Sequence, residues 1–91
     1  SFGGVLASSD ALAVGAMRAL RDAGLRIPQD TAVVGMNNDD LAEYTDPRLT
    51  SVELNAHRLG REAAELLMAA LEGAPPERRL VPHHLVLRDS S

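Results

Sequence analysis

The sequence of 91 residues contains no cysteine and no tryptophan. Without cysteine there are no disulfide bonds and no thiol chemistry, which is consistent with a reducing compartment. The only aromatic residues are Phe2 and Tyr44, too few for a surface that stacks nucleic-acid bases. No apolar run approaches the roughly 18 residues that a membrane span needs. No signal-peptide pattern is visible, but the sequence opens at Ser1 without an initiator methionine, so we expect a fragment of a longer protein.

Positive charge is also scarce. Nine Lys and Arg residues stand against thirteen Asp and Glu residues, which gives a formal net charge of −4 and a pI of about 5.2. A nucleic-acid-binding module is usually basic on at least one face, so this chain is not expected to bind DNA by itself. Its length allows at most one small domain or part of one.

Two apolar runs organise the first half of the chain. Residues 4–7 end in Ser-Ser-Asp at 8–10, and residues 31–36 end in Asn-Asn-Asp-Asp at 37–40. Between the two runs, apolar residues recur at helical spacing up to Gly24, whose conformational freedom suits a helix end. This order predicts an α/β fold built on a βαβ unit, with two parallel strands that are buried on both faces.

The second half predicts one long helix and one more strand. Residues 49–54 are extended and form either a strand or a crossing segment. Asn55 is expected to cap a helix over residues 55–72, which carries the strongest apolar stripe in the chain. A last strand is expected over residues 80–87; the proline within it predicts either an edge strand or an irregular first pairing. Residues 88–91 are expected to fray.

Ligands of open parallel sheets bind beyond the carboxyl ends of the strands. Both polar clusters lie there, which makes the two clusters candidates for a ligand site. Each has a simpler alternative. Ser9 is a good helix N-cap, and the two asparagines favour a turn.

No catalytic or metal-binding pattern is present. Ser8 and Ser9 lack the G-x-S-x-G elbow of serine hydrolases and a spaced histidine partner. The acidic pair at 39–40 lacks the spacing of a calcium loop and reads as a solvated helix start. The histidines at 83–84 point to opposite faces of a strand and cannot converge on one metal, and His57 has no Cys or His at a metal-binding interval. We therefore expect no enzyme, no metal and no cofactor.

Three stretches together resemble one known family. They are residues 8–16 (SSDALAVGA), residues 24–35 (GLRIPQDTAVVG) and residues 46–52 (DPRLTSV), the last of which is similar to a "PxLTTV" segment. These stretches, in this order, are similar to the LacI/GalR family of bacterial transcriptional repressors. The likeness covers essentially the whole chain.

The resemblance implies a periplasmic-binding-protein-like (type I) sensor domain. Such a domain has two α/β lobes, a small-molecule cleft between them and three crossings that join them. Residues 1–91 would then be the C-terminal fragment of one effector-binding domain. Residues 1–52 would end the second lobe, residues 53–79 would return to the first lobe with the helix at 55–72, and residues 80–91 would cross back and form the tail. The helix-turn-helix that reads DNA would lie upstream, outside this chain.

The resemblance also implies pocket positions. Ser9 and Asp10 stand where the family often has Asn-Asp, and Asn37 and Asn38 stand near its frequent Asp-Asp pair. Asn55 and Ala56 would lie at the cleft edge of the other lobe. The asparagine at 37 offers one acceptor and two donors where an aspartate only accepts. This change favours a ligand with a carbonyl or anionic oxygen over a polyol.

The resemblance also implies dimer contacts, on the crossover helix and shortly after the second apolar run. The matching residues are Val14, Met17, Arg18, Tyr44 and Thr45; core packing and a solvated face are the alternative for each. The implied function is the effector-sensing part of a cytoplasmic LacI-type repressor. Binding of a small, sugar-like or nucleoside effector would rearrange a homodimer and change its affinity for operator DNA, without a membrane partner. The alternative is a periplasmic sugar-binding protein of the same fold that serves a transporter. An enzyme with a doubly wound sheet lacks a catalytic constellation.

Overall fold

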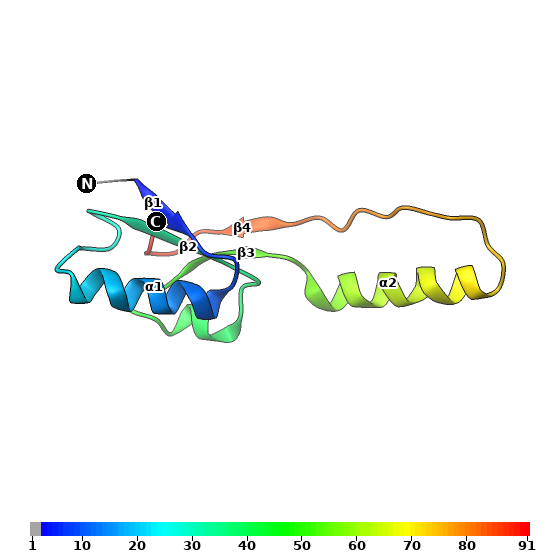
Figure 1. Cartoon of the computed structure of the whole chain (residues 1–91), viewed down its shortest axis with the longest axis horizontal. Coiled ribbons are helices and arrows are strands. Elements are labelled where there is room, and N and C mark those ends of the chain that lie inside the picture. Colours follow the sequence, from blue (N-terminus) through cyan, green and yellow to red (C-terminus); the bar gives the residue numbers. More distant parts are fainter. Residues whose placement is uncertain (1–2) are drawn as a thin grey trace.

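The computed structural model describes residues 3–91, so the predicted start of the second-lobe segment at Ser1 lies outside the described part (Figure 1). In chain order the elements are β1 (Gly4–Leu6), α1 (Asp10–Asp22), β2 (Ala32–Met36), the 3-10 helix η1 (Asp40–Glu43), β3 (Thr50–Glu53), α2 (Ala56–Leu71) and β4 (His84–Val86). The segment at 49–54, for which a strand or a crossing was expected, is therefore a strand over most of its length.

The four strands form one sheet in the order β1-β2-β3-β4. β1 and β2 are parallel, with Val5 opposite Val33, and β2 and β3 are parallel, with Gly35 opposite Ser51. β4 runs antiparallel to β3. The predicted α/β fold with a parallel βαβ unit is thus confirmed. β2 lies between two neighbours, as its continuous apolar sequence predicts.

The expectation that both parallel strands are buried on both faces was wrong. In β2, Val33 and Gly35 are buried but Val34 is only half-buried, and Leu6 in β1 is 66% exposed. The reason is that α1 covers one face of the sheet within this chain, and β1 is an edge strand with a single neighbour.

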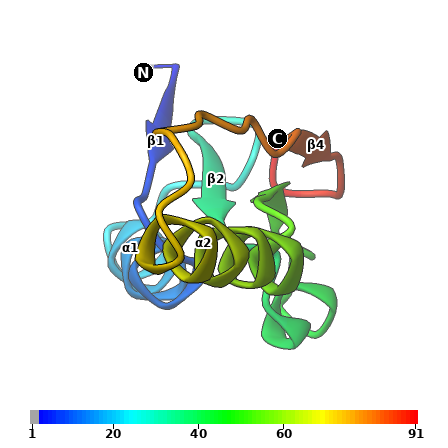
Figure 2. The same cartoon turned by 90° about the vertical axis from the view of Figure 1, so that its right-hand side faces the viewer.

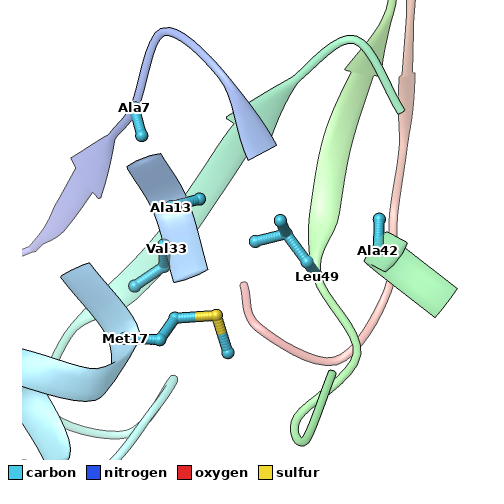
Figure 3. Packing of buried hydrophobic residues seen from close by; sticks show 6 residues of the cluster. All are labelled: Ala7, Ala13, Met17, Val33, Ala42 and Leu49. Atoms are coloured by element: carbon cyan, nitrogen blue, oxygen red, sulfur yellow. The ribbon is translucent and has the colours of Figure 1, made fainter. Parts of the chain in front are cut away.

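The core lies between α1 and the covered face of the sheet (Figure 3). Ala13 and Met17 of α1 face Val33 of β2, and Leu49 and Ala42 extend the same cluster. The small alanines allow the helix to approach the sheet closely. Packing of this cluster fixes α1 against the sheet, and with it the position of the first turn of α1.

Local capping determines where α1 begins and ends. The Oγ of Ser9 accepts a hydrogen bond from the backbone N of Leu12 at 3.2 Å, as expected for an N-cap. At the other end, Gly24 has φ of +79°, and the N of Leu25 donates to the O of Leu20 at 2.9 Å. Both features of the predicted helix are confirmed.

The C-terminal residues do not fray, which corrects the sequence-based expectation. Ser90 is fully buried. Its Oγ donates to the O of Val33 at 2.6 Å and accepts from the N of Thr50 at 2.8 Å, and its own O accepts from the N of Val33 at 2.8 Å. Ser90 therefore fills the place between β2 and β3 just before these strands begin to pair.

The α2 helix and the chain that returns beside it form an arm that extends away from the sheet (Figures 1 and 2). The molecule measures 58 × 23 × 19 Å. No residue of α2 is buried, and Leu59, Leu67 and Leu71 of the apolar stripe are exposed. The last strand is also shorter than the predicted 80–87, because residues 74–83 run along α2 without a strand partner.

Substitution of Ser90→Ala should lower the stability of the protein. The change leaves the N of Thr50 and the O of Val33 without their buried partner, which costs about 1–3 kcal/mol. Urea-induced unfolding measures the loss. The matched control is Ser8→Ala at an exposed position, which should stay within about 0.5 kcal/mol of the wild type. Equal stabilities of the two variants would contradict the role given to Ser90.

Substitution of Gly35→Ala should also destabilise the protein, by about 1–3 kcal/mol, because overpacking forces neighbours to move. A Cβ at this position would overlap the Oδ1 of Asp10 and would lie 3.1 Å from the Cδ2 of Leu49. Gly15→Ala in α1 meets open space and should instead stabilise by about 0.5–1 kcal/mol. Thermal unfolding of both variants tests these opposite signs.

Candidate functional site

The two polar clusters meet at the carboxyl edge of the sheet, as their positions after parallel strands predict. The contact is made by Asp10, at the start of α1. Its Oδ2 accepts from the backbone N of Asp39 at 2.6 Å, and its Oδ1 accepts from the Oγ of Ser51 in β3 at 2.6 Å. The helix dipole also favours a carboxylate in this first turn.

Asp10 has no exposed surface, which corrects the expectation that it contacts a ligand. A buried carboxylate is costly unless hydrogen bonds compensate for lost hydration, and here both oxygens accept one. Asp10 therefore links the loop after β2 to β3 beneath the edge of the site. Ser9 is half-buried and acts as the N-cap of α1; it does not line the cleft described below.

The loop after β2 has a left-handed backbone at two consecutive residues. Asn37 has φ of +95° and Asn38 has φ of +50°. Asparagine adopts this region more readily than most residues, so the backbone alone is one reason for both asparagines. The loop is anchored to β3, because the N of Asn37 donates to the O of Val52 at 2.8 Å and the N of Asn38 donates to the Oγ of Ser51 at 2.9 Å.

The side chains of the two asparagines are held in different ways. The Nδ2 of Asn37 donates to the Oδ1 of Asp39 at 2.6 Å. The Oδ1 of Asn38 accepts from the Nη2 of Arg88 at 2.7 Å, and its Nδ2 donates to the Oε1 of Glu53 at 3.4 Å. Asn38 thus uses both ends of its amide within the protein, whereas Asn37 uses one.

An open cleft of about 790 Å³ lies between this sheet edge and the first two turns of α2. The lining residues are Asn37, Asn38, Asp39, Asp40, Glu53, Asn55, Ala56, His57, Arg58 and Arg61. Four of the six residues predicted as ligand contacts are among them. The structure therefore brings Asn37 and Asn38 together with Asn55 and Ala56 across one cavity.

Asn55 occupies the N-cap position of α2, but its side chain does not cap the helix, in contrast to the prediction. Its backbone is left-handed, with φ of +53°, and its side chain makes no capping hydrogen bond. The Nδ2 of Asn55 instead donates to the O of Pro82 at 2.6 Å. This bond ties the segment that leaves the sheet to the segment that returns to it.

Six lining residues were not predicted from the sequence. Their charges differ between the two sides of the cleft. Asp39, Asp40 and Glu53 contribute carboxylates on the sheet side, and α2 contributes the three basic residues His57, Arg58 and Arg61. Positions 57, 58 and 61 share one helix face, so their common direction was readable from the sequence. The sequence did not show that this face turns toward the sheet edge.

Hydrogen bonds lower the pKa of the Glu53 carboxyl. The main cause is the hydrogen bond from the backbone N of Asn55, at 3.1 Å from Oε2, followed by the one from the side chain of Asn38. Both donors favour the charged carboxylate. The cleft consequently keeps this negative charge under mildly acidic conditions.

A second, smaller groove of about 250 Å³ lies beside α1. Its lining residues are Val14, Met17, Arg18, Arg21, Thr45 and Asp46. Three predicted dimer contacts, Val14, Arg18 and Tyr44, are exposed. Met17 differs, because only 4% of its surface is exposed and it belongs to the core; it has little surface for a partner.

Within residues 3–91, no group of three or more His, Cys, Asp or Glu side chains is arranged to hold a metal ion. In the same part of the chain, neither helix combines the length and the apolar character of a membrane span.

The mostly parallel sheet and the cleft at its carboxyl edge agree with one family of proteins. The chain belongs to the family of periplasmic binding protein-like domains, whose model matches residues 3–91.

Individual relatives narrow this class. The chain is 40% identical over 88 residues to the HTH-type transcriptional regulator CelR of Thermobifida fusca, a match that covers 94% of this chain and 26% of CelR. The solved complex of CelR with cellobiose matches with a TM-score of 0.88 and 39% identity, over 97% of this chain and 28% of that one. A LacI family regulator from Arthrobacter sp. FB24, in complex with lactose, matches with a TM-score of 0.78 and 39% identity, over 96% and 34%.

These relatives confirm the resemblance to the LacI/GalR family. They are transcriptional regulators, and several further curated relatives are named as HTH-type transcriptional repressors. The chain spans about a quarter of the length of the curated relatives it matches.

The carboxyl group of Glu53 should titrate below its ordinary value of 4.5 in an NMR pH titration. Because folding favours the charged form, its contribution to stability is complete above the unfolded-state pKa and is lost as the pH falls through the folded-state pKa. Asn38→Ala removes one donor and should move the pKa of Glu53 upward. Ser8→Ala should leave it in place, and an unchanged titration in both variants would contradict the assignment.

Proposed function

We propose that this chain is the C-terminal part of the effector-sensing domain of a LacI-type transcriptional repressor. The cleft at the carboxyl edge of the sheet carries the proposal, because the predicted contacts Asn37, Asn38, Asn55 and Ala56 all line it. The ligand is a small, sugar-like molecule. Relatives that are regulators, including the structure of CelR with cellobiose, favour a repressor over a transporter-linked binding protein.

The exposed arm supports the proposed two-lobe organisation. Residues 4–52 end the second lobe, and α2 packs in the first lobe of the complete protein, which would cover Leu59, Leu67 and Leu71. The chain leaves the second lobe near residues 53–55 and returns near residues 80–83. The cleft lies where the two lobes face each other, so a bound ligand stabilises one arrangement of the lobes over another.

Coupling to DNA requires a dimer. The groove beside α1, with Val14, Arg18 and Thr45 among its lining residues, and the exposed Tyr44 are the proposed contact surface between two copies. A change in the lobes alters the spacing of two helix-turn-helix modules, which lie outside this chain, and therefore the operator affinity. The complete protein acts in the cytoplasm, catalyses no reaction and needs no cofactor.

Ligand binding should stabilise the complete protein and change its affinity for DNA. A sugar at 100 times its dissociation constant adds about 2.7 kcal/mol, which a melting assay detects across a panel of neutral mono- and disaccharides that includes cellobiose. An operator selected from a random DNA library then reports coupling, expected at about 5- to 150-fold.

The side chain of Asn37 provides the matched variant for this test. Asn37→Gly removes the side chain and keeps the left-handed backbone, since glycine adopts positive φ without strain. Loss of one hydrogen bond should weaken ligand binding about tenfold, while Ser8→Ala should bind as the wild type does. A complete protein whose operator affinity no panel member changes would contradict the proposal.

A further inference from the structure

We propose that Asp39 is a positioning residue that turns the amide of Asn37 so that its carbonyl oxygen is presented to the ligand. The site is thereby selective for neutral ligands that donate hydroxyl hydrogen bonds. This inference rests on the proposed function and goes beyond it by assigning the cause of specificity.

The orientation of the Asn37 amide follows from the chemistry of its neighbour. The Oδ1 of Asp39 lies 2.6 Å from the Nδ2 of Asn37. An ionised carboxylate only accepts hydrogen bonds, so it must face the NH₂ group. The opposite orientation would place two acceptor oxygens against each other. The charge on Asp39 therefore fixes which end of the amide is bound within the protein.

The backbone of Asp39 is itself held by a hydrogen bond. Its backbone N donates to the Oδ2 of the buried Asp10 at 2.6 Å, and Asp10 is fixed in turn by Ser51. The backbone of Asn37 is anchored independently to Val52. The backbones of both members of the pair are thus tied to the sheet, and this places their two side chains next to each other.

The free end of Asn37 is an acceptor. Within the described residues, no donor makes a hydrogen bond to its Oδ1, and Asn37 lines the cleft. The asparagine at this position thus acts as the family's aspartate does, but without its charge. This reverses the expectation that Asn37 favours a carbonyl or anionic oxygen on the ligand.

The charges around Asn37 also disfavour anionic ligands. Asp40 and Glu53 line the same side of the cleft and repel anions. On the opposite wall, the guanidinium of Arg58 is paired with Glu62 at 2.8 Å, and that of Arg61 lies 3.9 Å from Glu65. These basic groups are therefore already partly neutralised within α2.

A charge swap in the complete protein tests the inference. Binding of neutral sugars, cellobiose among them, is compared by calorimetry with binding of glucuronate and glucose 6-phosphate. Asp39→Asn can either accept from or donate to the amide of Asn37, so it no longer fixes the orientation of that amide and should weaken binding of the preferred neutral sugar severalfold. In the double variant Asn37→Asp with Asp39→Asn, the new aspartate accepts from the new amide and keeps one oxygen for the ligand. It should recover wild-type affinity within about twofold.

The rescue distinguishes positioning from a structural role. A merely structural loss in Asp39→Asn would persist in the double variant, and that result overturns the inference. Glu72→Gln, which removes the same charge at the exposed end of α2, should bind as the wild type does. Tighter binding of glucuronate or glucose 6-phosphate than of every neutral sugar also overturns the inference while leaving the proposed function intact.

NMR of the unliganded protein gives a readout without any ligand. The side-chain amide proton of Asn37 that faces Asp39 should shift on Asp39→Asn substitution and stay in place in Glu72→Gln. If no probe binds, the proposed function is contradicted, and the amide signal alone then decides the orientation. An amide signal that does not move overturns the inference.

Discussion

The buried carboxylate of Asp10 is the interaction on which the arrangement of the site depends. It joins three segments that are distant in sequence: the first turn of α1, β3 through Ser51 and the loop after β2 through Asp39. Charge-assisted hydrogen bonds of this kind are stronger than neutral ones. Gly35 lies directly against this carboxylate, so the sheet beneath it has no room for a side chain. One acidic group thus sets both the packing of the βαβ unit and the shape of the loop at the cleft.

Local signals in the sequence were sufficient for the βαβ unit. Ser9, Gly24 and the two apolar runs predicted the limits of α1 and the parallel pairing of β1 with β2, because helix capping and the βαβ pattern depend on residues that are near one another in the sequence. The place of Ser90 was not predictable in this way. Its partner Val33 is 57 residues away, and the residues around Ser90 have the same local character whether this serine is exposed or buried.

The candidate site was likewise predicted only in part. Asn37 and Asn38 were found because polar residues after parallel strands share an edge, and Asn55 and Ala56 were found through the family resemblance. Asp10 was placed in the cleft wrongly, because nothing local indicates that it is buried and bonded to Ser51 of β3. Arg58 and Arg61 were missed because their contribution depends on the direction in which α2 leaves the sheet.

The tie between Ser90 and the start of β2 has a consequence for biosynthesis. Chains are made at about 5–20 residues per second, and the 57 residues between Val33 and Ser90 therefore take about 3–11 s to appear. During this interval the backbone N and O of Val33 lack their hydrogen-bond partners in Ser90. β1, α1 and β2 can meet early through local contacts, but the hydrogen bonds between β2 and Ser90 form only after residue 90 has emerged. Vectorial synthesis thus separates the pairing of β1 with β2 in time from the bonding of Val33 to Ser90.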